Sequence, residues 1–235
     1  MVKLLVSPMN KEEAKKSIEG GADIIDVKNP AEGSLGANFP WIINEIADFS
    51  KEHGKEVSAT IGDMSYKPGT ASLAALGAAC SGADYIKVGL FGVRVKKEAI
   101  NILNAVVKAV QDYDHSKKVV AAGYADYNRI GSIPPSILPE VCELTHADGV
   151  MVDTAIKDGS SLFDFMTTSE AELFISESHD RGLFCALAGN ISWRNIDTVK
   201  RLNPDILGVR TIVCENGRSS SISVRLVSKL IRMLK

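Results

Sequence analysis

The sequence lacks the features that mark nucleic-acid-binding, membrane-spanning and secreted disulfide-bonded proteins. Its 27 lysines and arginines nearly balance 29 acidic residues and form no basic block, so we expect no nucleic-acid partner. No apolar run approaches the roughly 20 residues needed to cross a bilayer, and no signal-peptide pattern is present, so we expect no membrane partner. Histidine is also scarce. The four histidines fall in predicted helices or at helix ends, which disfavours histidine triads and metal-dependent hydrolysis.

The cysteines are few and widely scattered. Cys80, Cys142, Cys185 and Cys214 form no CxxC pair and have no histidine at ligand spacing. This scatter disfavours both a disulfide framework and a zinc site. We therefore expect reduced thiols, a cytoplasmic location and no metal.

Short apolar segments of strand type alternate with longer segments of helical period along the chain, which is typical of a parallel sheet. The predicted strands are 3–7, 22–28, 56–61, 83–90, 118–124, 149–154, 183–189 and 206–210. The predicted helices are 11–20, 38–53, 70–81, 95–113, 136–146, 169–181, 192–202 and 221–234. Eight of each predict an α/β protein with one domain, residues 1–235, folded as a single (β/α)8 TIM barrel. An open doubly wound sheet is the alternative.

Several predicted strands begin after a related tripeptide. Gly-Ala-Asp occurs at 21–23 and 82–84, and His-Ala-Asp at 146–148. A glycine, or a substitute for it, would end the preceding helix in each case. These echoes indicate repetition of one βα unit.

Charged residues inside otherwise apolar strands are the first candidates for chemistry, because barrel enzymes place working residues at the carboxyl ends of strands. Asp26 and Lys28 are two residues apart and hence lie on one face of a strand. Lys87 is framed by apolar residues, and Asp153 is followed by Lys157. The longer loops 29–37, 62–69 and 155–168 all follow strands and would surround the same rim.

A desolvated lysine loses part of its preference for the charged form, and its free amine can attack an aldehyde or ketone to give an imine. We therefore predict a carbonyl-chemistry site built from Lys28, Lys87 and Lys157. Asp26 and Asp153 would pair with the lysines or transfer protons. The alternative is that each lysine only forms a salt bridge at the rim.

Phosphate is the second predicted ligand feature. Gly189 and Asn190 end one predicted strand, and Gly208 and Arg210 end another, where barrels often bind phosphate. Lys67 lies on the same side and could meet a second anion. The glycines could instead only ease tight turns, and Ser7 at a strand end is more often structural than a ligand contact.

Nearly the whole chain resembles the (5-formylfuran-3-yl)methyl phosphate synthases of methanofuran biosynthesis, also called 4-(hydroxymethyl)-2-furancarboxaldehyde-phosphate synthases. The resemblance lies in residues 5–8 (LVSP), 21–30 (GADIIDVKNP), 32–38 (EGSLGAN), 66–70 (YKPGT), 83–89 (ADYIKVG), 121–126 (AAGYAD), 153–159 (DTAIKDG), 162–165 (LFDF), 185–189 (CALAG) and 208–210 (GVR). The last twenty-five residues, which include the polar stretch 215–221, differ from the family pattern, so the resemblance implies no role for residues of that loop.

The resemblance implies a carbon–oxygen lyase that joins two glyceraldehyde 3-phosphate molecules into a phosphorylated furan aldehyde, with release of phosphate and water and no cofactor. It further implies that Lys28 forms the Schiff base and Lys87 accepts a proton. Asp26, Asp153 and Lys157 would be supporting acid, base and charge partners.

Two other functions stay open. The same lysine and phosphate sites would suit a Schiff-base aldolase or isomerase acting on a small sugar phosphate. A non-catalytic barrel that binds a phosphorylated ligand is the other alternative. Homo-oligomers are plausible for a barrel of this size and would have closed symmetry.

Overall fold

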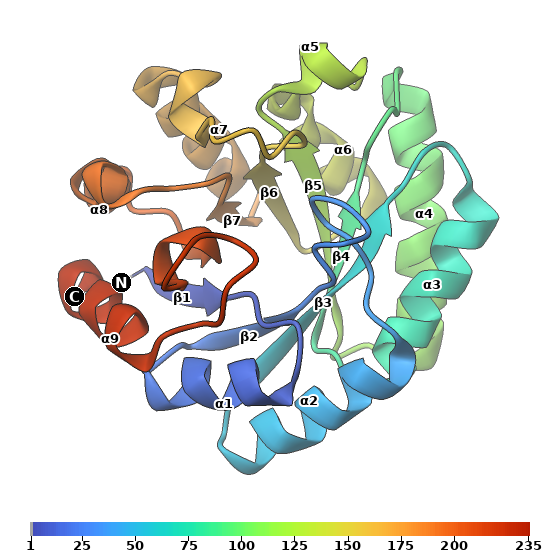
Figure 1. Cartoon of the computed structure of the whole chain (residues 1–235). Helices are drawn as coiled ribbons and strands as arrows, with labels where there is room; N and C mark the ends of the chain where they lie inside the picture. The colour runs from blue at the N-terminus through green and yellow to red at the C-terminus, as the bar shows by residue number, and fades with distance from the viewer. Residues whose placement is uncertain (1) are drawn as a thin grey trace.

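Eight parallel strands close into a barrel in chain order, with β8 pairing back to β1 (Figure 1). The structure is a computed structural model that describes residues 2–235. The strands are β1 Lys3–Val6, β2 Ile24–Val27, β3 Glu56–Asp63, β4 Tyr85–Gly89, β5 Lys118–Tyr124, β6 Gly149–Asp153, β7 Phe184–Leu187 and β8 Ile206–Val209. This confirms the predicted α/β fold class, a single (β/α)8 TIM barrel, over the open doubly wound sheet.

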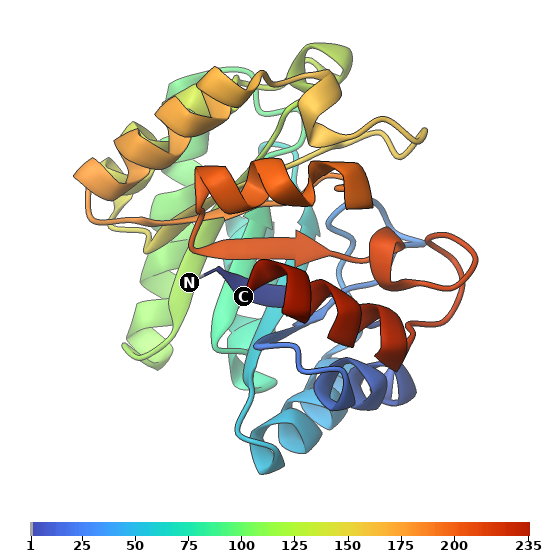
Figure 2. The same ribbon diagram turned by 90° about the vertical axis from the view of Figure 1, so that its left-hand side faces the viewer.

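Helices surround the barrel in the two perpendicular views (Figures 1 and 2). They are α1 Lys11–Glu19, α2 Pro40–Glu52, α3 Pro68–Cys80, α4 Lys96–Tyr113, α5 Tyr127–Ile130, α6 Leu138–Thr145, α7 Thr168–Asp180, α8 Ile196–Leu202 and α9 Val224–Leu234. Four 3-10 turns are η1 Pro135–Ile137, η2 Leu162–Asp164, η3 Trp193–Asn195 and η4 Thr211–Val213. No helix among the described residues is long and apolar enough to span a bilayer.

The elements differ from their predicted ranges at several ends, and three of the differences have a clear local cause. The helix α5 was not predicted, since four residues are too short to show a helical period. The helix α3 begins at Pro68, two residues before the predicted start at 70, because proline suits the first helical position. The strand β3 continues to Asp63, beyond the predicted end at 61, through a register shift against β4.

The tripeptide echoes correspond to one repeated hydrogen-bond arrangement at the amino ends of the strands. The residue at the helix end has a positive φ at Gly21, Gly82, His146 and Asn203. Two residues later an aspartate accepts a backbone N–H from the preceding strand. The four bonds are Leu4 to Asp23 (2.8 Å), Val57 to Asp84 (2.9 Å), Val119 to Asp148 (2.8 Å) and Cys185 to Asp205 (2.8 Å). Each aspartate thus fixes the register of its strand against the preceding one.

Side-chain alternation along the strands determines which residues enter the barrel lumen. Ile25 and Val27 of β2 belong to the apolar layer between barrel and helices, so Asp26 faces the lumen. The same alternation turns Lys87 of β4 and Asp153 of β6 inward. The lower lumen is filled by a separate apolar cluster that includes Leu5, Ile24, Tyr85, Val120, Met151 and Ile206. Asp26, Lys87 and Asp153 therefore lie above this cluster at the carboxyl end of the barrel, while Lys3, Glu56 and Lys118 lie around Tyr85 at its amino end.

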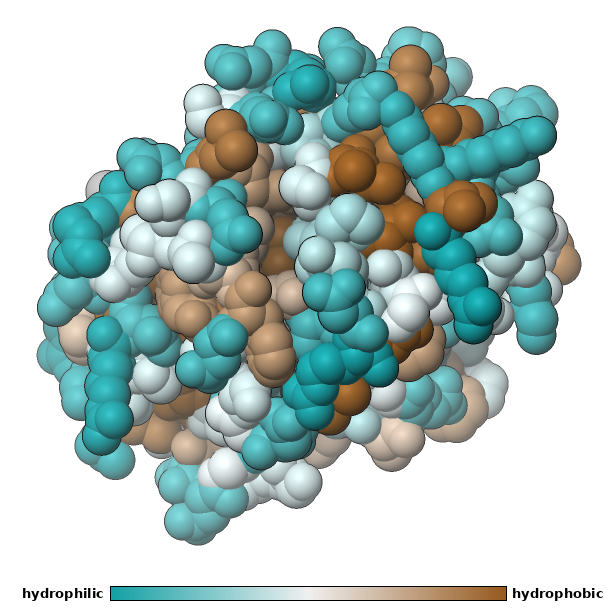
Figure 3. All heavy atoms as spheres, turned by 90° about the horizontal axis from the view of Figure 1, so that it is seen from above, coloured by the Kyte–Doolittle hydropathy of each residue, from teal (hydrophilic) through white to brown (hydrophobic). Residues whose placement is uncertain are grey.

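The face seen from above in Figure 3 is mixed in character. Seen from above the view of Figure 1, hydrophilic side chains are interspersed with smaller hydrophobic patches (Figure 3). Exposed aromatic side chains include Phe39 and Trp41, whose rings stack with centroids 4.7 Å apart at the start of α2.

Candidate active site

The structure brings the five predicted catalytic residues together at the carboxyl end of the barrel. They come from β2, β4, β6 and the loop after β6. Asp26, Lys87, Asp153 and Lys157 all act electrostatically on the amine of Lys28. The side-chain alternation of the strands therefore brings three lysines and two aspartates together around the Lys28 amine.

Asp26 and Lys87 form a buried ion pair beneath Lys28. Lys87 Nζ lies 2.6 Å from Asp26 Oδ1, and the two side chains are 2% and 0% exposed. The other carboxylate oxygen of Asp26 accepts a hydrogen bond from the Ser7 hydroxyl at 2.8 Å. Ser7 is therefore a positioning residue for Asp26. Each group stabilises the charge of the other, because both side chains are shielded from water and neither could be solvated without its partner.

Asp153 and Lys157 form the second ion pair of the site. Lys157 Nζ lies 2.5 Å from Asp153 Oδ1 and also donates to the Thr154 hydroxyl at 3.2 Å. Burial raises the pKa of Asp153, but the nearby Lys157 and Lys28 and the hydrogen bonds outweigh it and lower that pKa to about 2. Asp153 is thus a fixed negative charge at neutral pH.

Lys28 is the lysine of the site without an ion-pair partner. Its side chain is 5% exposed, and no carboxylate of residues 2–235 lies within 4.0 Å of its amine. Desolvation by burial lowers the pKa of Lys28 to about 7, with Lys87 and Lys157 acting in the same direction and Asp153 and Asp26 opposing them. A substantial fraction of this amine is therefore neutral and nucleophilic at neutral pH.

A narrow cleft lies at these groups and opens to solvent. Its lining contains Lys28, Asp153 and Lys157 together with the predicted phosphate residues Gly189, Asn190, Gly208 and Arg210. Lys67 is not in this lining; it is exposed and directly precedes α3 at the outer rim. The geometry therefore gives no support to the prediction that Lys67 binds a second phosphate.

Close backbone approach shapes the phosphate side of the cleft. Gly189 has φ +96°, and a Cβ there would lie 3.1 Å from the backbone nitrogen of Thr154. Asn190 also has a positive φ, and its amide donates to the Gly159 carbonyl at 2.7 Å. A Cβ at Gly208 would lie 3.1 Å from the Met151 methyl group. These positions leave backbone N–H groups accessible at the cleft wall.

Arg210 lines the cleft, but its guanidinium is held by protein groups. Its guanidinium is 4% exposed and donates to both carboxylate oxygens of Glu13, at 2.8 and 3.2 Å. It also donates to the carbonyls of Ser7 (2.7 Å) and Arg218 (2.9 Å). The prediction of a phosphate-binding guanidinium here overlooked Glu13, which is distant in sequence and lies on α1. Arg210 instead joins α1, β1 and the loop after η4.

Asp63 and Tyr124 are further residues of the site that the sequence pattern does not predict. The Tyr124 phenol is fully buried and donates a hydrogen bond to Asp63. Burial, together with Asp63, raises the pKa of Tyr124 well above its usual value. Asp63 also accepts the backbone N–H of Ser34 at 2.8 Å and of Leu35 at 3.3 Å, which fixes the loop after β2 over the lumen. No local pattern indicates Asp63, because Gly62 follows the apolar segment of the strand and interrupts it.

Two further residues of the rim were also missed. Asp126 accepts the backbone N–H groups of Ala155 (2.6 Å) and Ile156 (2.9 Å), so it orders the loop that carries Lys157. Arg218 lines the cleft from the polar stretch 215–221, for which the family resemblance implies no role.

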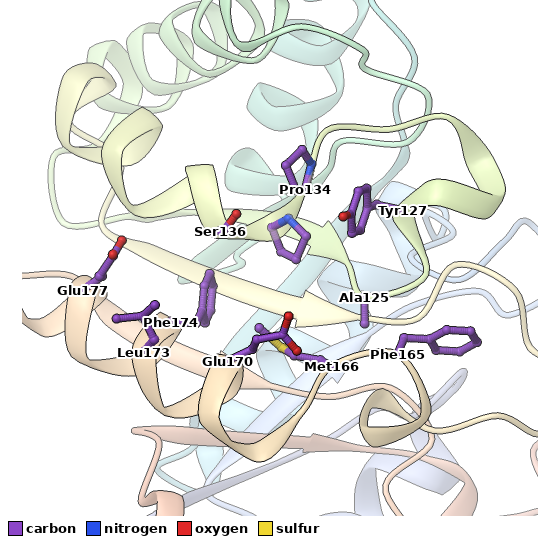
Figure 4. A pocket seen from close by; sticks show the side chains of 11 residues that line it. Ala125, Tyr127, Pro134, Ser136, Phe165, Met166, Glu170, Leu173, Phe174 and Glu177 are labelled. Atoms are coloured by element: carbon purple, nitrogen blue, oxygen red, sulfur yellow. The ribbon is translucent and has the colours of Figure 1, made fainter.

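A second, more apolar pocket lies outside the barrel (Figure 4). It is formed between η1 and α7 and is lined by side chains such as Pro134, Met166, Leu173 and Phe174, with Glu170 and Glu177 at its edge. None of the five clustered charged residues lines it, so it is separate from the lysine site.

Comparisons with known proteins found a matching family. The family described as 4-HFC-P synthase matches residues 4–231. A (5-formylfuran-3-yl)methyl phosphate synthase from Archaeoglobus fulgidus is 64% identical over 230 residues, covering 98% of each chain. The protein of the same name from Methanocaldococcus jannaschii is 52% identical over 234 residues, covering 99% of each.

Solved structures of low sequence identity share the fold. A 3-hexulose-6-phosphate synthase has a TM-score of 0.68 at 19% identity and covers all of both chains. The phosphoribosyl anthranilate isomerase from Thermus thermophilus has a TM-score of 0.65 at 15% identity, covering 99% of this chain and 98% of that one. These similarities support the barrel architecture.

Proposed function

Because the chain belongs to the (5-formylfuran-3-yl)methyl phosphate synthase family, we propose that it condenses two molecules of glyceraldehyde 3-phosphate into that furan phosphate. Atom balance requires the release of one phosphate and two water molecules. The reaction would be that of a carbon–oxygen lyase acting through a Schiff base, in methanofuran biosynthesis in the cytoplasm.

The observation that carries the proposal is the unpaired, buried amine of Lys28 between two ion-paired lysines. A neutral amine adds to the aldehyde carbon, and loss of water gives an imine. The imine withdraws electrons from the adjacent carbon, so its C–H proton becomes acidic. A base of the site removes this proton and leaves an enamine, which can attack the second aldehyde or expel phosphate.

The other charged groups have proposed roles that follow from their positions. Lys87 and Asp26 exchange a proton with the substrate, with Lys87 as the acceptor when its own proton has moved to a neighbouring base. Asp153 stabilises the positive charge of the protonated imine, and Lys157 keeps Asp153 ionised and oriented. The backbone at Gly189, Asn190 and Gly208 binds a phosphate, and Arg210 fixes the shape of that wall.

Borohydride trapping tests the proposal. The protein is incubated with glyceraldehyde 3-phosphate and borohydride, and the adduct is located by peptide mapping. A parallel sample without reductant is followed by ultraviolet absorbance. We expect an adduct on Lys28 and the absorbance of a conjugated furan aldehyde. An adduct without that absorbance would contradict the synthase reaction and support an aldolase or isomerase. Absence of both signals would support a ligand-binding barrel.

A further inference from the structure

Arg218 lies in the loop that connects η4 to α9, beyond the end of β8. Figure 2 shows this loop, in red, projecting past the arrowhead of β8. The side chain lines the cleft together with Lys28, Gly189 and Gly208. A cation from an otherwise polar surface loop thereby lines the same cleft as the proposed imine site.

The guanidinium of Arg218 is half-buried but is not neutralised by a protein anion. No carboxylate of residues 2–235 lies within 4.0 Å of it, and its side chain makes one long hydrogen bond, to the Gly33 carbonyl at 3.4 Å. Desolvation lowers the pKa of Arg218, and Arg210 adds to this, while Asp153 and Asp63 oppose it from a distance. A partly desolvated cation without a counter-ion is unfavourable, so this arrangement is suited to an anionic ligand.

The surrounding structure holds Arg218 at this place. Arg210 donates from Nε to the Arg218 carbonyl at 2.9 Å, and Arg210 is itself fixed by Glu13. The base of the loop is closed by the antiparallel bridge between Cys214 and Ile222. Arg210 thus positions the backbone of Arg218, and the Arg218 side chain lines the cleft.

Backbone donors line the same cleft. The N–H groups of Gly189 and Asn190 donate to no backbone oxygen of residues 2–235 outside the helices and strands. Two free backbone N–H groups and a guanidinium around one cleft provide the directional donors that a phosphate monoester accepts, and a guanidinium can contact two phosphate oxygens at once.

We propose that Arg218 binds the phosphoryl group of the substrate whose aldehyde reacts with Lys28. The assignment deepens the proposed function and rests on it for the identity of the substrate. Arg218 supplies the charge-assisted contact that the sequence pattern predicts for Arg210. Arg210 and Glu13 are positioning residues for the loop that carries it.

Titration of inorganic phosphate into the purified protein, followed by calorimetry, tests the assignment without requiring turnover. We expect Arg218→Gln to raise the dissociation constant of phosphate at least about tenfold, since a hydrogen bond to a charged group is lost. Arg218→Lys keeps the charge without the two-pronged geometry, so its effect is smaller. Arg232→Gln removes an exposed arginine of α9 and is the matched control, with unchanged phosphate affinity.

Borohydride trapping with and without a phosphoryl group separates this assignment from the proposed function. Arg218→Gln should need a higher concentration of glyceraldehyde 3-phosphate for half-maximal trapping, but the same concentration of unphosphorylated glyceraldehyde as the unmodified protein. Phosphate affinity of Arg218→Gln within about twofold of the unmodified protein would overturn the assignment, as would absence of phosphate binding by the unmodified protein. Absence of a Lys28 adduct with either aldehyde would instead contradict the proposed function.

Discussion

The Asp26 carboxylate lies 2.6 Å from the Lys87 ammonium, while Lys28, two residues further along from Asp26, has no carboxylate within 4.0 Å among the described residues. Asp153 similarly engages Lys157. Two lysines of the cluster are thus each paired with a carboxylate. The third is desolvated beside two cations, and its pKa falls to about 7. Selective activation of one lysine out of three follows from this pairing.

The first prediction concerns the pH dependence of activity. Because the neutral amine of Lys28 is the nucleophile, kcat/KM should rise with pH up to about 7 and then level off. Lys28→Arg keeps a cation but cannot form an imine, so activity should fall at least about 10³-fold. Steady-state furan formation across this pH range measures both. Lys200→Arg, at an exposed position on α8, is the control and should behave like the unmodified protein. A profile that is flat around pH 7 would contradict the assignment of Lys28.

The second prediction concerns stability. Lys28 has a lower pKa in the folded protein than in the unfolded chain, so the unfolded chain binds more protons between about pH 7 and about pH 10.5. The free energy of unfolding contributed by Lys28 therefore rises with pH through this window and is least favourable below about pH 7. Relative to Lys28→Met, the unmodified protein should gain roughly 2–3 kcal/mol between about pH 6 and about pH 9. Urea denaturation at the two pH values measures the difference. A constant difference would show that Lys28 remains charged in the folded protein.

The third prediction concerns the buried ion pair. Lys87→Met leaves the Asp26 carboxylate buried without its cation, and we expect a loss of about 3–5 kcal/mol of unfolding free energy. Lys87→Met combined with Asp26→Leu removes both charges and should cost less than the sum of the single substitutions. Chemical denaturation of the four proteins gives the coupling energy. Additive effects would mean that the two groups do not stabilise each other's charge.

Much of the fold could be predicted because its causes are local. Strand and helix periods and the repeated tripeptide before the strands are visible in the sequence, and the tripeptide corresponds to real strand-start hydrogen bonds. Convergence of Asp26, Lys28, Lys87, Asp153 and Lys157 followed from alternation within strands and from the common rim of a parallel barrel. Predicting this convergence needs only the two-residue alternation of side chains along each strand and the direction in which each strand runs.

The parts that could not be predicted depend on contacts between distant segments. Arg210 was expected to bind phosphate, but Glu13 occupies its guanidinium across a sequence separation of 197 residues. Arg218 belongs to a loop without a regular pattern, and only its tertiary position shows that it faces the cleft. Asp63 was assigned to a loop because Gly62 interrupts the strand pattern, and Gly62 has a φ of +108°.

The fourth prediction concerns Gly89, which lies beside the hydrogen bond between Tyr124 and Asp63. A Cβ at position 89 would collide with the Tyr124 hydroxyl oxygen and lie 3.1 Å from Asp63 Oδ1, so Gly89→Ala must displace the phenol. Loss of this buried hydrogen bond should cost about 1–3 kcal/mol of unfolding free energy. Since Asp63 also holds the N–H groups of Ser34 and Leu35, their amides should exchange faster with solvent.

Gly77 provides the matched control for this substitution. It lies inside α3, and a Cβ there would meet no atom within 4 Å apart from its chain neighbours and the nearby backbone of the helix itself. Gly77→Ala should therefore raise the unfolding free energy by about 0.5–1 kcal/mol, because alanine loses less backbone freedom in a helix. Thermal denaturation and hydrogen exchange of both variants measure the contrast. If Gly89→Ala left the exchange of Ser34 and Leu35 unchanged, Tyr124 would not be what holds Asp63, and with it the loop after β2, over the lysine site.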